Sequence, residues 1–162
     1  MNSGDREYRQ SELEEWDKRY LWHPFTQMRD YCNESPLIIE RGEGSFLYDI
    51  HGNRYLDGVS SLWVNVHGHR REEIDRAIIS QVQRISHSTL LGISSVPAIL
   101  LAKKMADMAP PGLSRIFYSD DGSTAVEIAL KIAFQYWQQQ RPPRKRKHKF
   151  VSLDYAYHGD TL

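Results

Sequence analysis

The chain has 162 residues, of which 40% are hydrophobic, and its 21 Lys and Arg residues balance its 21 Asp and Glu residues. A formal charge of zero argues against nucleic acid or an anionic membrane as a partner, and no apolar run approaches the roughly 20 residues that span a bilayer. The single cysteine, Cys32, excludes an internal disulfide, and the polar N-terminus is unlike a secretory signal, so we expect a cytoplasmic protein.

Residues 1–69 predict a short helix followed by a small β meander, which we assign to part of a small domain. The spacing of Ser11 and Glu14 is that of a capping box and opens a charged helix that ends near Tyr20. An aromatic, proline-broken segment at 21–28 predicts irregular structure. Short strands joined by glycine-containing turns follow, at residues 37–40, 45–49 and 54–57.

Residues 70–162 predict the first part of a large α/β domain. Apolar residues recur at helical spacing from Ile74 to Ile85 and again from Ile99 to Ala106. A strand at 115–119, a helix at 124–140 and a strand at 150–153 then form a βαβ unit, which implies a parallel sheet. No later helix covers the last strand, so we expect a truncated domain and a fragment of a larger protein.

The turn Asp121-Gly122-Ser123 is the first candidate site. It places backbone N–H groups and a hydroxyl at the start of a helix, where a phosphate binds well. The alternative is a plain helix start that Asp121 caps. Tyr157 and His158 follow the next predicted strand. An aromatic ring beside a phosphate-binding turn suggests a phosphorylated, planar cofactor.

Two further motifs favour ordinary structure. His67 and His69 have loose metal-ligand spacing, but no Cys or carboxylate pattern joins them, so no metal site is predicted. The basic run at 141–149 could be a nuclear localisation signal, or it could contact the phosphate backbone of a nucleic acid. Because no interleaved aromatic residues accompany it, a solvated loop is favoured.

Four collinear blocks carry a resemblance to a known family. The chain resembles the N-terminal portion of class III, fold-type I, pyridoxal-phosphate aminotransferases. That resemblance implies an α/β fold with a small antiparallel β segment and the start of a large mixed or parallel-sheet domain. The blocks are Trp-His-Pro-Phe-Thr-Gln-Met at 22–28, Asp-Gly-Val-Ser-Ser-Leu-Trp at 57–63 with His67-Gly68, Asp-Asp-Gly-Ser-Thr-Ala-Val-Glu at 120–127, and Tyr-His-Gly-Asp-Thr at 157–161.

The resemblance also implies roles for individual residues. Gly122 and Ser123 would hold the phosphate of pyridoxal 5'-phosphate, and Tyr157 would lie against the pyridine ring with His158 beside it. The substrate pocket would include Phe25, Leu62, Trp63 and Tyr157. The family's Schiff-base lysine lies downstream of the 157–161 block, so no catalytic residue is expected in this chain, which should be inactive alone.

The block at 22–28 narrows the resemblance to members that convert 8-amino-7-oxononanoate to 7,8-diaminononanoate in biotin biosynthesis. Leu62 and Phe25 stand where such members often carry Trp and Tyr, so the amino donor stays open between S-adenosylmethionine and lysine. The resemblance implies a homodimer with active sites at the subunit interface. The alternatives are another class III aminotransferase for an ω-amino acid or diamine, and a short non-catalytic protein that binds a phosphorylated ligand or a partner.

Overall fold

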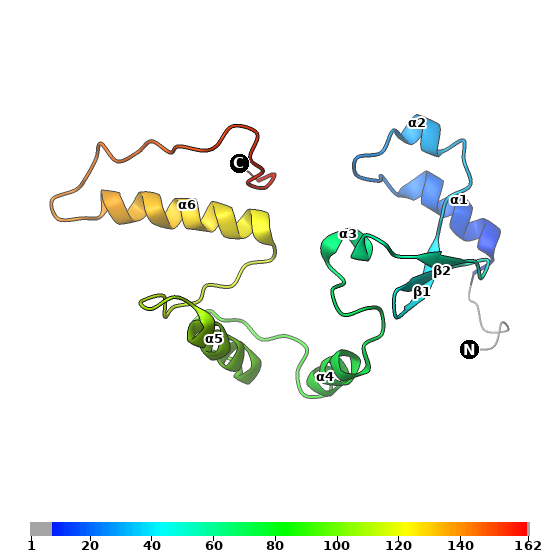
Figure 1. The fold of residues 1–162 in the computed structure, drawn as a ribbon, viewed down its shortest axis with the longest axis horizontal. Coiled ribbons are helices and arrows are strands. Elements are labelled where there is room, and N and C mark those ends of the chain that lie inside the picture. Colours follow the sequence, from blue (N-terminus) through cyan, green and yellow to red (C-terminus); the bar gives the residue numbers. More distant parts are fainter. Residues whose placement is uncertain (1–7, 162) are drawn as a thin grey trace. The chain divides into compact units, whose positions relative to one another are not determined.

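The structure is a computed structural model that describes residues 8–161. Contacts divide the chain into two units, the first ending at His87 and the second beginning at Ser88, and Figure 1 labels the elements of each. The helix that follows residue 70 thus belongs to the first unit by its contacts. The predicted domain boundary between residues 69 and 70 stays a prediction.

The first unit opens with α1 (Gln10–Tyr20), close to the predicted range. The predicted capping box is displaced by two residues, because the N-cap is Arg9 instead of Ser11 and the Arg9 backbone N–H donates to the Glu12 carboxylate at 2.8 Å. A short helix that the sequence did not predict, α2 (Met28–Tyr31), follows the irregular segment. Its first turn is stabilised by the Gln27 side chain, which accepts from the Arg29 N–H.

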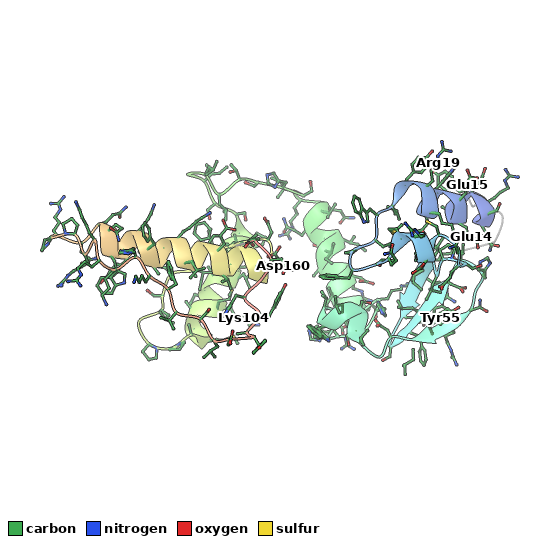
Figure 2. All side chains as sticks on the ribbon, turned by 90° about the horizontal axis from the view of Figure 1, so that it is seen from above. Glu14, Glu15, Arg19, Tyr55, Lys104 and Asp160 are labelled. Carbon is green, nitrogen blue, oxygen red and sulfur yellow. The ribbon has the colours of Figure 1, made fainter. Side chains whose placement is uncertain are left out.

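The predicted antiparallel meander is confirmed. Strands β1 (Ile39–Glu43), β2 (Phe46–Asp49) and β3 (Arg54–Leu56) form one sheet in the order β1-β2-β3. Helix α1 is tied to the β2–β3 turn, since His51 Nε2 lies 3.0 Å from a Glu14 carboxylate oxygen. Figure 2 labels Glu14 on α1 and Tyr55 on the sheet.

Asp49 organises the turn between β2 and β3. Its buried carboxylate accepts from the backbone N–H groups of His51 and Asn53, from the Asn53 amide and from the Tyr55 hydroxyl, all at 2.8–2.9 Å. Burial alone would raise the pKa of Asp49, but these hydrogen bonds outweigh it and lower the pKa to about 2. The carboxylate is therefore a structural anchor of the meander.

The first unit continues through α3 (Ser60–Trp63) to α4 (Glu72–Val82). Helix α4 confirms the predicted helical period and carries acidic residues in its first turn, where they complement the helix dipole. Helix α3 lies in a segment for which the sequence predicted no element. Its residues have positive φ angles, and two of them, Leu62 and Trp63, are predicted pocket residues.

The second unit contains α5 (Val96–Met108) and α6 (Gly122–Gln138), both close to the predicted helices. The strands predicted at 115–119 and 150–153 are wrong for this structure, because neither segment pairs with a strand among residues 8–161. A strand needs a neighbour to satisfy its backbone groups. The segment at 115–119 instead contacts α5, where the Tyr118 hydroxyl donates to the Ala98 carbonyl at 2.7 Å.

The basic run at 141–149 forms the predicted solvated loop, with every residue exposed. It returns along the end of α6, where the Arg144 N–H donates to the Trp137 carbonyl at 2.9 Å. The Lys147 ammonium lies 5.1 Å from the centre of the Trp137 ring. These contacts give the loop a local structural role.

Apolar side chains are mostly exposed in both units. Within residues 8–161, Ile50 and Pro36 are the only apolar residues that are buried. Large exposed apolar residues on the helices include Ile78, Ile79, Val82, Ile99, Leu100, Ile132 and Phe134. Exposed apolar surface on this scale is typical of faces that pack against other protein surfaces. None of the helices in the described part of the chain is long and apolar enough to cross a membrane.

Candidate functional site

The turn at the start of α6 has the geometry that an anion site needs. Asp121 caps the helix in an extended conformation, and its carboxylate accepts from the Thr124 N–H at 2.8 Å. Thr124 Oγ1 accepts from the Asp121 N–H at 3.1 Å, which completes the capping box. Gly122 and Ser123 therefore form the first helical turn, whose N–H groups have no acceptor within the helix. They stand at the positive end of the helix dipole.

The terminal segment of the described chain returns to this turn. The Asp160 N–H donates to Ser123 Oγ at 3.3 Å, and Thr161 Oγ1 donates to the Ser123 carbonyl at 3.3 Å. In Figure 1 the red terminal segment comes back to the yellow start of α6, and Figure 2 labels Asp160 there. Ser123 Oγ thus accepts from Asp160 and also hydrogen-bonds the Tyr157 hydroxyl.

Gly159 makes this contact possible. Its φ is +105°, and a Cβ added there would lie 2.5 Å from Ser123 Oγ and 2.7 Å from Ser123 Cα. Real Cβ atoms do not come so close to other heavy atoms. Glycine is therefore required at position 159 both by the left-handed backbone and by the close approach of the two segments.

Tyr157 presents an exposed ring next to the same turn. Its hydroxyl donates to the Asp160 carboxylate at 2.9 Å. The hydrogen bond to Asp160, reinforced by desolvation and the carboxylate charge, raises the pKa of Tyr157. The phenol is therefore kept neutral, and its ring faces are free for stacking because 76% of the residue is exposed.

His158 directly follows Tyr157 in the terminal segment. It lines a cavity of ≈ 260 Å³ with Val126 and Leu130 of α6 and with Val151. Nearby, the Lys131 ammonium pairs with the Glu127 carboxylate, and this hydrogen bond lowers the pKa of Glu127, with a smaller contribution from Thr161. Glu127 is thus engaged in structure.

The loop that carries Phe25 is anchored by a buried carboxylate. Asp17 of α1 accepts from the Tyr31 hydroxyl at 2.7 Å and lies 3.1 Å from His23 Nε2. Burial, followed by the hydrogen bond to Asp17, raises the pKa of Tyr31 to about 12. Phe25 has a φ of +51° and a fully exposed ring. The anchored loop therefore projects an apolar side chain outward.

Leu62 and Trp63 lie on a left-handed turn. The φ angles of Ser60, Ser61, Leu62 and Trp63 are +51°, +48°, +63° and +68°. Left-handed helical backbone costs an L-residue about 1–2 kcal/mol. The surrounding contacts must therefore hold these four residues in place.

The turn is held by Asp57, which accepts from the Ser61 N–H and the Ser61 hydroxyl, each at 2.8 Å. His69 Nε2 lies 2.8 Å from the same carboxylate. The two hydrogen bonds from Ser61 lower the pKa of Asp57, with a smaller contribution from His69. His69 is thus a partner of a carboxylate, and no group of three His, Cys, Asp or Glu side chains that could hold a metal occurs in the range 8–161.

The structure brings some of the predicted site residues together. Ser123 and Tyr157 both contact Asp160 in the second unit, and Gly122 directly precedes Ser123 in the turn. Phe25 lies in the first unit on a different segment from Leu62 and Trp63, and their union in one pocket with Tyr157 stays a prediction. The sequence assigned no role to Asp160 and Gly159, although their place directly after Tyr157-His158 was the available signal. The roles of Asp57 and Asp17 were also missed.

The start of α6 with the exposed ring of Tyr157 beside it is the arrangement that the sequence predicted for a phosphorylated, planar group. The family model described as aminotransferase class-III matches residues 28–162, and the chain belongs to this family. Over 156 residues it is 52% identical to the adenosylmethionine-8-amino-7-oxononanoate aminotransferase of Geobacter sulfurreducens, covering 96% of this chain and 34% of that protein. The chain thus spans about a third of the length of the curated relatives it matches.

Solved structures agree with this placement. The crystal structure of adenosylmethionine-8-amino-7-oxononanoate aminotransferase from Methanocaldococcus jannaschii is 53% identical, with a TM-score of 0.86 over 94% of this chain and 34% of that chain. The omega transaminase from Pseudomonas jessenii in complex with PMP is 33% identical, with a TM-score of 0.81 over 91% of this chain and 32% of that chain. The predicted fold class, fold-type I, is confirmed.

Proposed function

We propose that this chain forms the cofactor-phosphate region of a pyridoxal-phosphate aminotransferase that converts 8-amino-7-oxononanoate to 7,8-diaminononanoate. In the experiments below, the full-length protein means the longer polypeptide that this proposal requires. The observation that carries the proposal is the contact between Ser123 and the Tyr157–Asp160 segment at the start of α6. The name of the Geobacter sulfurreducens relative supports the choice of substrate.

The residues at this turn fit the proposed cofactor. A phosphate dianion needs several donors and a positive field, and the first N–H groups of α6 and the Ser123 hydroxyl supply them. A flat pyridine ring needs an apolar face, and the exposed ring of Tyr157 offers one. When bound, pyridoxal phosphate supplies an electron sink for the amino-transfer chemistry.

The chain's own residues position the cofactor and the substrate. Gly122 and Ser123 would hold the phosphate, and Asp160 keeps both Ser123 and Tyr157 in place through its N–H and its carboxylate. His158 would lie beside the ring. Fixing these groups before the ligand arrives reduces the cost of ordering them on binding.

The pocket residues suit a long aliphatic ketone. Phe25, Leu62 and Trp63 are exposed in the described structure, and together with Tyr157 they would provide apolar walls for 8-amino-7-oxononanoate. Phe25 offers no hydroxyl to an amino donor, so S-adenosylmethionine and lysine both remain candidate donors. The catalytic lysine is expected in the part of the full-length protein outside this chain, so this chain alone is expected to be inactive.

We expect the purified full-length protein, loaded with pyridoxal phosphate, to form 7,8-diaminononanoate from 8-amino-7-oxononanoate. Steady-state turnover with S-adenosylmethionine and with lysine, measured separately by mass spectrometry, identifies the donor. The 162-residue chain is the matched control and should give no product. If neither S-adenosylmethionine nor lysine supports turnover, the proposed substrate is refuted.

A second class III activity, on an ω-amino acid or diamine, is favoured by one observation, the likeness to the Pseudomonas jessenii omega transaminase. The higher identity to the Methanocaldococcus jannaschii structure favours the first proposal.

We further propose a homodimer, which the exposed apolar residues of α4, such as Ile78 and Val82, support. Neither nucleic acid nor a membrane is proposed as a partner. The cytoplasmic location stays a prediction.

A further inference from the structure

The left-handed turn Ser60–Trp63 needs an external support. Its four residues all have positive φ, between +48° and +68°, and none of them is glycine. Leu62 is 69% exposed and Trp63 is 82% exposed, so their side chains gain little packing that could hold the backbone. Hydrogen bonds must therefore fix it, both those of the backbone, such as the one from the Val64 N–H to the Ser60 carbonyl at 3.0 Å, and those of polar side chains.

The carboxylate of Asp57 makes the side-chain contacts. Its side chain is 5% exposed, and it accepts two hydrogen bonds from Ser61, one from the backbone N–H and one from the hydroxyl. Both atoms of Ser61 are thus bound to one buried group. This arrangement fixes the backbone at the residue immediately before Leu62.

His69 connects the carboxylate to the sheet. Its ring nitrogen Nε2 lies 2.8 Å from Asp57 Oδ2. Its backbone exchanges two hydrogen bonds with Gly44 at the end of β1, at 2.7 and 3.1 Å. The ring also packs on Gly42, where an added Cβ would lie 2.6 Å from His69 Cγ. These contacts hold the imidazole in place, and the imidazole in turn fixes the position of the Asp57 carboxylate.

We propose that Asp57, Ser61 and His69 act as a positioning unit that holds Leu62 and Trp63 in the orientation required to bind the ketone substrate. The inference rests on the proposed function, because it assigns Leu62 and Trp63 to the wall of that enzyme's pocket. Asp57 and His69 need not touch the substrate. They act through the backbone of the turn.

The first test compares Asp57→Asn and Ser61→Ala with Ser60→Ala in the full-length protein. Asn replaces one acceptor oxygen by a donor that faces Ser61 or His69, and Ala at 61 removes the hydroxyl contact. We expect the KM for 8-amino-7-oxononanoate to rise about tenfold in both variants, with kcat and the affinity for pyridoxal phosphate unchanged. Ser60→Ala, on the same turn, leaves Asp57 and Ser61 intact and should keep the original KM.

A rescue experiment separates positioning from general stability. Glycine adopts positive φ without strain. Adding Ser60→Gly to Asp57→Asn should therefore bring the raised KM part of the way back to its original value. If Asp57 only stabilised the fold, Asp57→Asn would lower the thermal unfolding temperature with KM unchanged, and glycine at position 60 would have no raised KM to restore. An unchanged KM in Asp57→Asn, or no recovery in the double variant, would overturn the proposal.

A readout independent of turnover keeps this inference distinct from the proposed function. With 5-fluorotryptophan incorporated, the fluorine resonance of Trp63, identified through Trp63→Phe, should shift in Asp57→Asn and Ser61→Ala but not in Ser60→Ala. If the protein turns over no ketone while this pattern holds, the proposed substrate fails and the positioning unit stands. If the resonance does not move, the positioning unit fails whatever the enzyme catalyses.

Discussion

Replacement of Gly159 by alanine should weaken the binding of pyridoxal phosphate to the full-length protein about 10- to 100-fold. The added methyl would lie 2.5 Å from Ser123 Oγ, so the terminal segment or the start of α6 must shift. Either shift breaks the contact between Asp160 and Ser123 that orients the hydroxyl. Absorbance or fluorescence titration with the cofactor measures the effect.

Gly112→Ala is the matched control for this experiment. Gly112 has a similar positive φ, +93°, but a Cβ there meets no heavy atom within 4 Å. Its substitution therefore introduces comparable backbone strain without the clash, and cofactor affinity should be unchanged. Equal losses in Gly112→Ala and Gly159→Ala would show that the close approach to Ser123 has no role in binding.

Replacement of Ser123 by aspartate should separate the structural role of this turn from its role in binding a phosphate. A carboxylate in the first turn of α6 complements the helix dipole and stabilises the helix by about 0.3–1 kcal/mol. The same carboxylate repels a phosphate at close range, and cofactor affinity should fall about 100- to 1,000-fold. Thermal unfolding without cofactor and cofactor titration measure the two effects on the same preparation.

Ser123→Asn provides the control for side-chain size. Asparagine has the shape of aspartate without its charge, so its affinity should lie well above that of Ser123→Asp. A plain helix start predicts that Ser123→Asp leaves ligand binding unaffected. Retention of pyridoxal phosphate by this variant at the original affinity would therefore remove the turn from the cofactor site.

Local features were predictable from the sequence. Asp121 followed by Gly122 and Ser123 marks a helix start through short-range capping, and the structure places the cap there. The glycines at 44 and 52 have positive φ and mark the turns of the meander. Such elements depend on interactions within a few residues, which the sequence displays directly.

Features that depend on distant residues were not predictable. The segments at 115–119 and 150–153 have the composition of strands, but within the described structure neither has a neighbouring strand to supply the hydrogen bonds. The left-handed turn at Ser61 carries no glycine signal, because the carboxylate of Asp57 and the anchored ring of His69 impose it. The sequence shows a glycine at position 159, but the reason for it, the close approach to Ser123, is a contact between segments that are distant in the sequence.

The most direct test of the proposed function is a competition between acceptors. The full-length enzyme would receive equal concentrations of 8-amino-7-oxononanoate and 2-oxoglutarate in one reaction, with S-adenosylmethionine, lysine and a diamine present as donors. Mass spectrometry then measures both aminated products at early times. We predict that 7,8-diaminononanoate is the dominant product. Dominant amination of 2-oxoglutarate at the expense of the diamine would contradict the proposal and would assign the chain to a different class III aminotransferase.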